Sequence, residues 1–179
     1  MPEAPRGRVL LAIAHEAIEH DDDPLEACAW EEPWLREWGA TFVTLRLEGE
    51  LCGCIGSIEP RRALGDDVAH NARAASRDSR FPRLARAMLP RLDVEVSLLS
   101  SREPVVAESE AHALSLLRPG LDGIVLEYGV HCATFLPQVW ESLADPLEFL
   151  SELRRKARLP SRFWHPELRI SRYTVEKFL

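Results

Sequence analysis

The chain has 179 residues, a length that suits one domain of ordinary size or one domain with a small appended lobe. Apolar residues make up 46% and charged residues 28%, a balance typical of a globular protein and not of a disordered one. The formal net charge of −7 argues against nucleic-acid binding through the surface as a whole.

The N-terminal part predicts a helix and a short apolar turn. Apolar residues recur at helical spacing over residues 7–20, which predicts an amphipathic helix that ends at the acidic run and proline of residues 21–24. Residues 33–38 form a turn or short helix whose Trp34 and Trp38 we expect on the core. The charges within the first apolar run argue against a signal peptide, and no stretch has the ~18 apolar residues of a membrane helix. We therefore expect a cytoplasmic protein with reduced thiols.

The rest of the chain predicts hairpins with helices between them. Residues 41–47 and 51–58 alternate around a short loop, which is typical of a β-hairpin. Because no regular βαβ repeat occurs, we expect an α+β fold with a mostly antiparallel or mixed sheet and flanking helices. The other expected elements are helices at 66–77, 83–88, 109–117 and 145–159, strands at 92–100 and 167–178, and a hairpin at 123–129 and 131–137.

Two cysteines lie two residues apart in the second strand of the first hairpin. Residues of a strand that are two apart face the same side, so we expect Cys52 and Cys54 to be buried together or to face a cleft together. A catalytic thiol needs activation by a neighbouring charge or base, and the flanking Gly53 and Gly56 would admit a ligand or direct amides at an oxyanion. The alternative is a cysteine buried as a small hydrophobic residue.

Other chemistries have less support. A Cys-x-Cys pair with His70, His131 or Cys132 could supply thiolate and imidazole ligands, but paired C-x-x-C loops are absent, so no metal site and no cofactor is predicted. Residues 61–91 carry eight arginines against three acids, which suits an anionic small molecule or an acidic partner, or is simply a solvated surface. Nucleic-acid binding through this segment is a weaker alternative, because aromatic residues are not interleaved with the arginines.

Several ordered motifs resemble one family, the AMMECR domain, which is found in bacteria as the AmmeMemoRadiSam system protein A. The blocks that carry the resemblance are LxGCIG (51–56), NARAASRDSRFPRL (71–84), LPRLDVEVSLLSSREPV (89–105), GLDGIVLEYG (120–129), ATFLPQVWESLADPLEFL (133–150) and SRYTVEKF (171–178). The resemblance implies one domain over residues 1–179, with a larger and a smaller subdomain, and we expect the smaller one within about 59–91. It also implies a shared pathway with a Memo-like protein and a radical SAM protein.

The resemblance singles out positions but also shows a departure. The family usually has arginine where this chain has Cys52, and often has arginine where Cys132 stands, so Cys54 is the thiol that matches the family. Asp78 and Arg80 also match the family blocks. They could have a purely structural role, in which Asp78 pairs with Arg80 and fixes the exit of the preceding helix. The remaining positions that match the family blocks are Asn71, Glu95 and Glu127.

Two functions from different classes remain. The first is an enzyme or enzyme subunit with a cleft at Cys54, in which Glu95 or His131 is the base and Arg80 binds an anionic group, with Gly53, Gly56, Asn71, Asp78 and Glu127 as further binding residues. The second is a non-catalytic binding or regulatory subunit that meets its partners through the Trp34/Trp38 region or the arginine segment. No membrane association is expected in either case.

Overall fold

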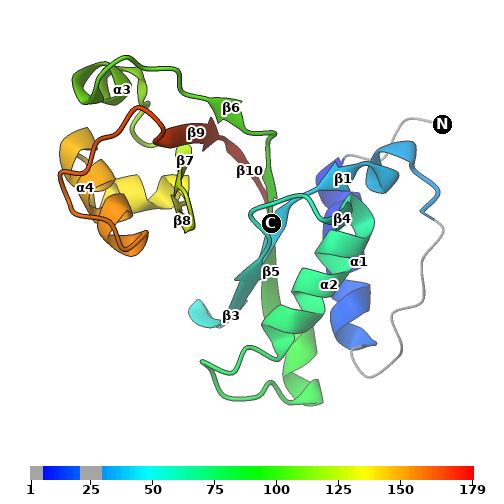
Figure 1. The fold of residues 1–179 in the computed structure, drawn as a ribbon. Coiled ribbons are helices and arrows are strands. Elements are labelled where there is room, and N and C mark those ends of the chain that lie inside the picture. The colour runs from blue at the N-terminus through cyan, green and yellow to red at the C-terminus, as the bar shows by residue number, and fades with distance from the viewer. Residues whose placement is uncertain (1–5, 21–29) are drawn as a thin grey trace. The chain divides into compact units, whose positions relative to one another are not determined.

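The computed structural model describes residues 6–20 and 30–179, which form two compact units (Figure 1). The first unit comprises Met1–Leu99 and Glu176–Leu179, and the second comprises Ser100–Val175. Each unit has its own hydrophobic core, so each is described by itself. Residues 21–24, which were expected to end the first helix, lie outside the described residues, and so does Cys28.

The main sheet of the first unit is antiparallel in its central pairings and has the order β10-β5-β2-β3. Its strands are β2 (Thr41–Leu47), β3 (Glu50–Gly56), β5 (Leu92–Leu99) and β10 (Val175–Phe178). The predicted hairpin of β2 and β3 and the predicted strand β5 are confirmed. Because β3 pairs only with β2 in this sheet, β3 is an edge strand.

Two helices cover one face of this sheet, α1 (Arg6–Glu19) and α2 (Leu64–Ser76) (Figure 1). They bury apolar stripes against Val43, Leu45 and Val96, which are all 0% exposed. Residues between these buried positions, such as Thr44, therefore point to the opposite face, which we call the open face of the sheet. Asp66 and Asp67 lie in the first turn of α2, as expected, where negative charge suits the helix dipole.

A β-bulge shifts the register of the hairpin. Leu47 pairs with Glu50 across the two-residue loop and Arg46 pairs with Leu51, but Leu45 pairs with Gly53, so Cys52 is the extra residue. An unbroken hairpin would place Cys54 opposite Val43 and hence on the helix face. The extra residue instead places Cys54 opposite Thr44, on the open face.

The second unit contains an antiparallel sheet of order β6-β9-β7-β8. Its elements are β6 (Glu103–Pro104), α3 (Glu110–Leu116), β7 (Gly123–Tyr128), β8 (His131–Phe135), α4 (Pro146–Lys156) and β9 (Arg169–Tyr173). The side chain of Asp145 caps α4 through the N–H groups of Leu147 and Glu148, and Pro146 follows at the first helical position, as its sequence predicts. The Trp140 ring stacks on Phe149 at 3.7 Å between centroids within the core.

Short elements complete the chain. A two-stranded ladder pairs β1 (Trp38–Gly39) with β4 (Arg62–Ala63). Turns of 3-10 helix cover Pro33–Arg36, Arg86–Arg91 and Pro137–Glu141. Within residues 6–20 and 30–179, every helix is too short or too polar to cross a bilayer.

The structure corrects three expectations. Residues 167–178 form two strands in two sheets, because the chain leaves β9 at Thr174, whose main chain bonds with Ser100, and then joins β5 as β10. The segment 59–91 lies within the first unit, because its helix α2 packs on β2 and β3, and the second unit is Ser100–Val175. Trp34 packs on the core as expected, whereas Trp38 is 70% exposed.

Close packing at Gly53 gives a first test. A Cβ at this position would overlap the main-chain carbonyl oxygen of Ala75 in α2. We expect Gly53→Ala to lower the free energy of unfolding by roughly 2–3 kcal/mol, because rigid backbone cannot yield to the added methyl group. Urea denaturation would measure it. Gly49→Asn is the matched control, since Gly49 has φ +86° and open space around it, and asparagine tolerates that backbone. Equal losses in the two variants would contradict the packing argument.

Candidate functional site

Cys54 lies on the edge strand with its main-chain polar groups directed away from β2. Its N–H donates to Asp78 Oδ2 at 3.1 Å, and its carbonyl oxygen accepts from Arg80 Nη2 at 2.7 Å. The pair with Thr44 is therefore of the non-hydrogen-bonded type, in which opposite side chains approach closely. An unpaired strand edge is a template for the addition of another strand. At Cys54 this edge is instead occupied by the side chains of Asp78 and Arg80.

Asp78 and Arg80 form a tight ion pair, as the alternative interpretation of this segment predicted. Arg80 donates from Nε to Oδ1 at 2.9 Å and from Nη2 to Oδ2 at 2.6 Å. The main-chain N–H of Arg80 also donates to Oδ1 at 3.2 Å. The Asp78 side chain is 3% exposed and that of Arg80 62% exposed, so a buried carboxylate is held by a guanidinium that covers it. We call the Asp78–Arg80 pair on the Cys54 main chain the edge clamp.

The clamp sets the charge state of its carboxyl group. The hydrogen bond from the Arg80 side chain, with smaller contributions from the N–H groups of Cys54 and Arg80, holds the pKa of Asp78 well below its usual range. Burial opposes this shift but does not overcome it. Conversely, the Asp78 carboxylate raises the pKa of Arg80. Arg80 was predicted to bind an anionic group. Its Nε and Nη2 already donate hydrogen bonds to Asp78 and to the main chain of Cys54.

The thiol of Cys54 faces a polar row across the sheet. Its Sγ lies 3.4 Å from Thr44 Oγ1, and Thr44 pairs in turn with Glu95 on β5. Glu95 is thus two strands away, about 10 Å between main chains. Its Oε1 accepts from Ser97 Oγ at 3.2 Å and lies 3.4 Å from Lys177 Nζ. Glu95 therefore shares the open face with Cys54, with Thr44 between them.

Thr44 is the neighbour that sequence reasoning missed. The two-residue loop at Glu48 and Gly49 would have placed Thr44 opposite Gly53 in an unbroken register. No residue of the hairpin signals the bulge by itself, although a glycine within a strand is a frequent sign of one.

Asn71 has a structural place on the helix face. Its Nδ2 donates to Asp67 Oδ2 at 2.9 Å and to the carbonyl oxygen of Thr41 at 3.0 Å. Asp67, which is fully buried, also accepts from the N–H and hydroxyl of Thr41 and from Ser57 Oγ, each at 2.8 Å. This network fastens the first half of α2 to the start of β2 and the end of β3. Asn71 is thus occupied by protein groups.

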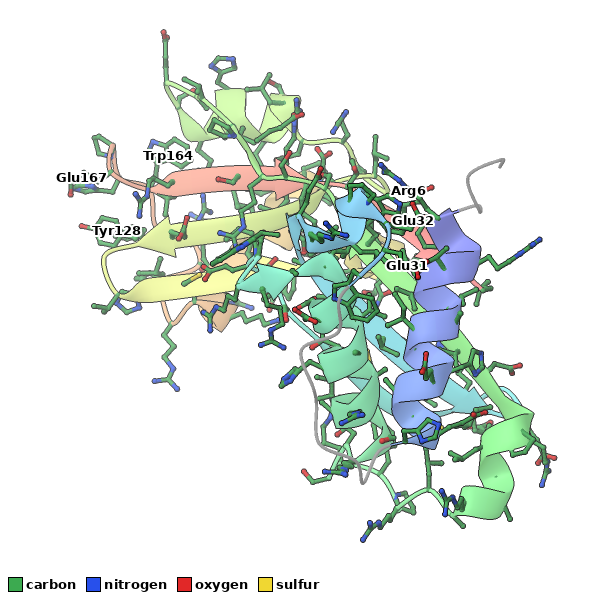
Figure 2. All side chains as sticks on the ribbon, turned by 90° about the vertical axis from the view of Figure 1, so that its right-hand side faces the viewer. Arg6, Glu31, Glu32, Tyr128, Trp164 and Glu167 are labelled. Atoms are coloured by element: carbon green, nitrogen blue, oxygen red, sulfur yellow. The ribbon has the colours of Figure 1, made fainter. Side chains whose placement is uncertain are left out.

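His131 and Glu127 belong to the second unit. His131 Nδ1 lies 2.9 Å from the carbonyl oxygen of Ala157, and His131 pairs with Tyr128 across β7 and β8. Glu127 pairs with Cys132 on one side and Arg169 on the other. Figure 2 shows Tyr128 at the same end of this unit as Trp164 and Glu167, and the Tyr128 ring contacts Phe163 and His165. His131 thus shares the face of the sheet that carries Tyr128 and its aromatic cluster, whereas Glu127 points to the opposite face.

Cys52 and the two glycines that flank Cys54 have packing roles. Cys52 packs against the core of the first unit, and burial raises the pKa of its thiol while Arg46 lowers it less. The two cysteines therefore lie on opposite faces, and the expectation of a shared face is wrong because of the bulge. A Cβ at Gly56 would overlap the Phe42 ring, so both flanking glycines meet protein atoms. In the part of the chain that the structure describes, no three His, Cys, Asp or Glu side chains are grouped to hold a metal ion.

The fold and the site define an α+β protein with a half-buried thiol on the open face of a sheet. Residues 11–178 match the family AMMECR1. A protein of Methanothermobacter thermautotrophicus is 38% identical, over 96% of this chain and 93% of its own length, and a protein of Thermofilum pendens is 34% identical, over 98% and 90%. The crystal structure of an uncharacterised protein from Pyrococcus horikoshii superposes with a TM-score of 0.81 at 30% identity, over 96% of this chain and 89% of that one. The chain therefore belongs to the AMMECR1 family, which confirms the resemblance.

The edge clamp has a pH signature. We expect Asp78→Asn to lower the free energy of unfolding by roughly 2 kcal/mol at pH 7, because hydrogen bonds to a charged group are lost. The pKa of the Asp78 carboxyl is lowered by folding, so its stabilising effect is full above the unfolded pKa near 4 and is lost as the pH falls through the folded pKa. The stability difference between wild type and variant should shrink below about pH 4.

Urea denaturation from pH 7 to pH 3 measures this difference. Asp93→Asn, which changes an exposed aspartate of β5, serves as the control and should cost little at any pH. A stability loss in Asp78→Asn that stays constant down to pH 3 would show that the carboxylate charge is not what the clamp uses.

Proposed function

We propose that this protein is a cytoplasmic enzyme, or an enzyme subunit, whose reactive group is the thiol of Cys54, and that it works with Memo-like and radical SAM proteins. Cys54 acts as a nucleophile or as an acyl or thiol carrier for a small-molecule substrate. The observation that carries the proposal is that the edge clamp holds both the N–H and the carbonyl oxygen of Cys54 while its Sγ faces the open side of the sheet.

A fixed main chain favours thiol chemistry. Catalysis requires the reacting atom to stay within a few tenths of an ångström of its working position, which rigid supporting contacts provide. An edge-strand residue is ordinarily free on one side, yet Cys54 is held by a buried carboxylate and a guanidinium. A cysteine with only a packing role, such as Cys52, is instead directed into the core.

The roles of the neighbouring groups follow from their placement. The Thr44 hydroxyl is in hydrogen-bonding range of Sγ, so it orients the thiol or passes a proton. Glu95 is the candidate base that shares the open face with Cys54, and a proton would reach it through Thr44 or a bound molecule. His131, the other candidate base, belongs to the second unit. Arg80 acts as a positioning residue through its bond with the Cys54 carbonyl oxygen.

Alkylation kinetics test the reactivity of the thiol. Each cysteine is left alone in turn by replacing the others with serine, and its iodoacetamide rate in the folded protein is divided by its rate in urea. We expect a ratio near or above one for Cys54 despite its half-buried position, about one for exposed Cys132, and strong protection for Cys52.

The variant Thr44→Val refines this test. It keeps the shape of the side chain and removes the hydroxyl beside Sγ, so we expect the Cys54 rate to change several-fold with the fold intact. Protection of Cys54 as strong as that of Cys52 would contradict the proposed reactivity.

A second candidate function is a non-catalytic subunit that presents a docking surface. The observation that favours it is Trp38, which is 70% exposed on the β1–β4 ladder. Exposed tryptophan is enriched at binding hot spots. Nearby in the first unit, the Arg6 guanidinium lies 5.4 Å from the Trp34 ring centroid, and Figure 2 shows Glu31 and Glu32 by Arg6.

Partner binding separates the two functions. In co-purification with the Memo-like and radical SAM proteins, we expect Trp38→Ser to lose complex formation if this surface docks them, since a buried hot-spot tryptophan contributes 2 kcal/mol or more, roughly 30-fold in affinity. Val106→Ser, which removes another exposed apolar residue, is the control. Retained binding in Trp38→Ser would remove this surface from consideration, and loss of activity without loss of binding in Cys54→Ser would favour the enzyme.

A further inference from the structure

A cavity of about 460 Å³ lies in the first unit beside the edge clamp, where the chain leaves α2. Its wall is made by Arg77, Asp78, Ser79, Phe81 and Arg83. The volume is within the range of small-molecule sites, and the wall combines one aromatic ring with several hydrogen-bond donors. Cys54 is not part of the wall, so this cavity differs from the thiol face described above.

The wall carries positive charge that its one acid does not neutralise. The Asp78 carboxylate already accepts two bonds from the Arg80 side chain, whose guanidinium balances it. The other acids of residues 61–91 are also engaged, since Asp66 accepts from Trp30 Nε1 at 2.9 Å and Asp67 is fully buried. Arg83 thus adds a cationic side chain to a wall whose carboxylate is satisfied, and Arg77 also lines this wall.

Arg83 differs from most of the other exposed arginines of the segment because it lies in the cavity wall. Arg61, Arg62 and Arg91 have the carboxylates of Glu59, Asp67 and Glu48 within ion-pair distance. Among the described residues, Arg83 has neither a carboxylate within that distance nor a protein acceptor for its side chain. An exposed arginine without a carboxylate, in a cavity wall beside a hydroxyl donor at Ser79, is suited to bind an anion.

We propose that this cavity binds a small phosphorylated molecule, with the phosphate on Arg83, Arg77 and Ser79 and the rest of the ligand on Phe81. Phosphate matches the planar donor array of arginine, and the Phe81 ring supplies the apolar contact that inorganic ions do not use. Because Asp78 belongs both to the cavity wall and to the edge clamp, the bound ligand would lie beside a residue that holds the main chain of Cys54. The site goes beyond the proposed thiol chemistry and does not require it.

Calorimetric titration of the full chain with phenyl phosphate, inorganic phosphate and benzyl alcohol tests the site. We expect phenyl phosphate to bind most tightly, inorganic phosphate more weakly and benzyl alcohol not measurably. Arg83→Gln should weaken phenyl phosphate binding about tenfold or more, since it removes a charge-assisted contact. Arg77→Gln provides a second variant, with its thermal melting checked because Arg77 caps α2.

The matched control is Arg86→Gln, which removes an exposed arginine of the same segment that is not in the wall. Equal weakening by Arg86→Gln and Arg83→Gln would overturn the proposal, because it would show diffuse charge attraction. Absence of phenyl phosphate binding at 150 mM salt would overturn it as well. Cys54→Ala should leave the affinity unchanged, so failure of the thiol hypothesis and failure of this one give different results.

Discussion

The one-residue bulge at Cys52 determines which face of the sheet each following residue of β3 occupies. A strand alternates its side chains between two faces, so a single extra residue reverses the face of every side chain beyond it. Here that reversal places Cys54 on the open face and brings Gly53 against α2. The lack of a side chain at Gly53 lets the helix approach, and the approach brings the helix exit at Asp78 within reach of the edge strand.

Helix α2 is attached to the sheet by two buried carboxylates, and they serve different ends. Asp67, within the helix, accepts from Thr41 and Ser57 and thereby joins two strands to the first turns. Asp78, just beyond the helix, binds an edge strand and recruits Arg80 to cover itself. The first attachment fixes where the helix lies, and the second uses that placement to hold one cysteine. A polar group buried without such partners would be costly, so both sites are constrained to remain fully bonded.

Local patterns predicted most elements, because apolar periodicity and turn residues are local in the chain. The hairpin of β2 and β3, the strand β5 and the helix after Asp145 formed where their patterns placed them. The face of Cys54 was not predictable in this way, because it depends on a one-residue register shift that the alternation of the hairpin does not reveal. The strand at 167–178 was likewise mistaken as continuous, since its alternation persists across the point where it changes sheets. The Asp78–Arg80 pair was foreseeable because its two members are only two residues apart.

Strand β10 makes the first unit discontinuous in the sequence. The chain completes β2, β3 and β5, then builds the whole second unit, and only afterwards supplies the strand that pairs with β5. Phe178 of this strand packs on the core of the first unit, where its ring lies against Gly7 of α1. During synthesis on the ribosome, β5 therefore stays unpaired on one side until about 75 further residues have emerged. At ordinary elongation rates this takes several seconds.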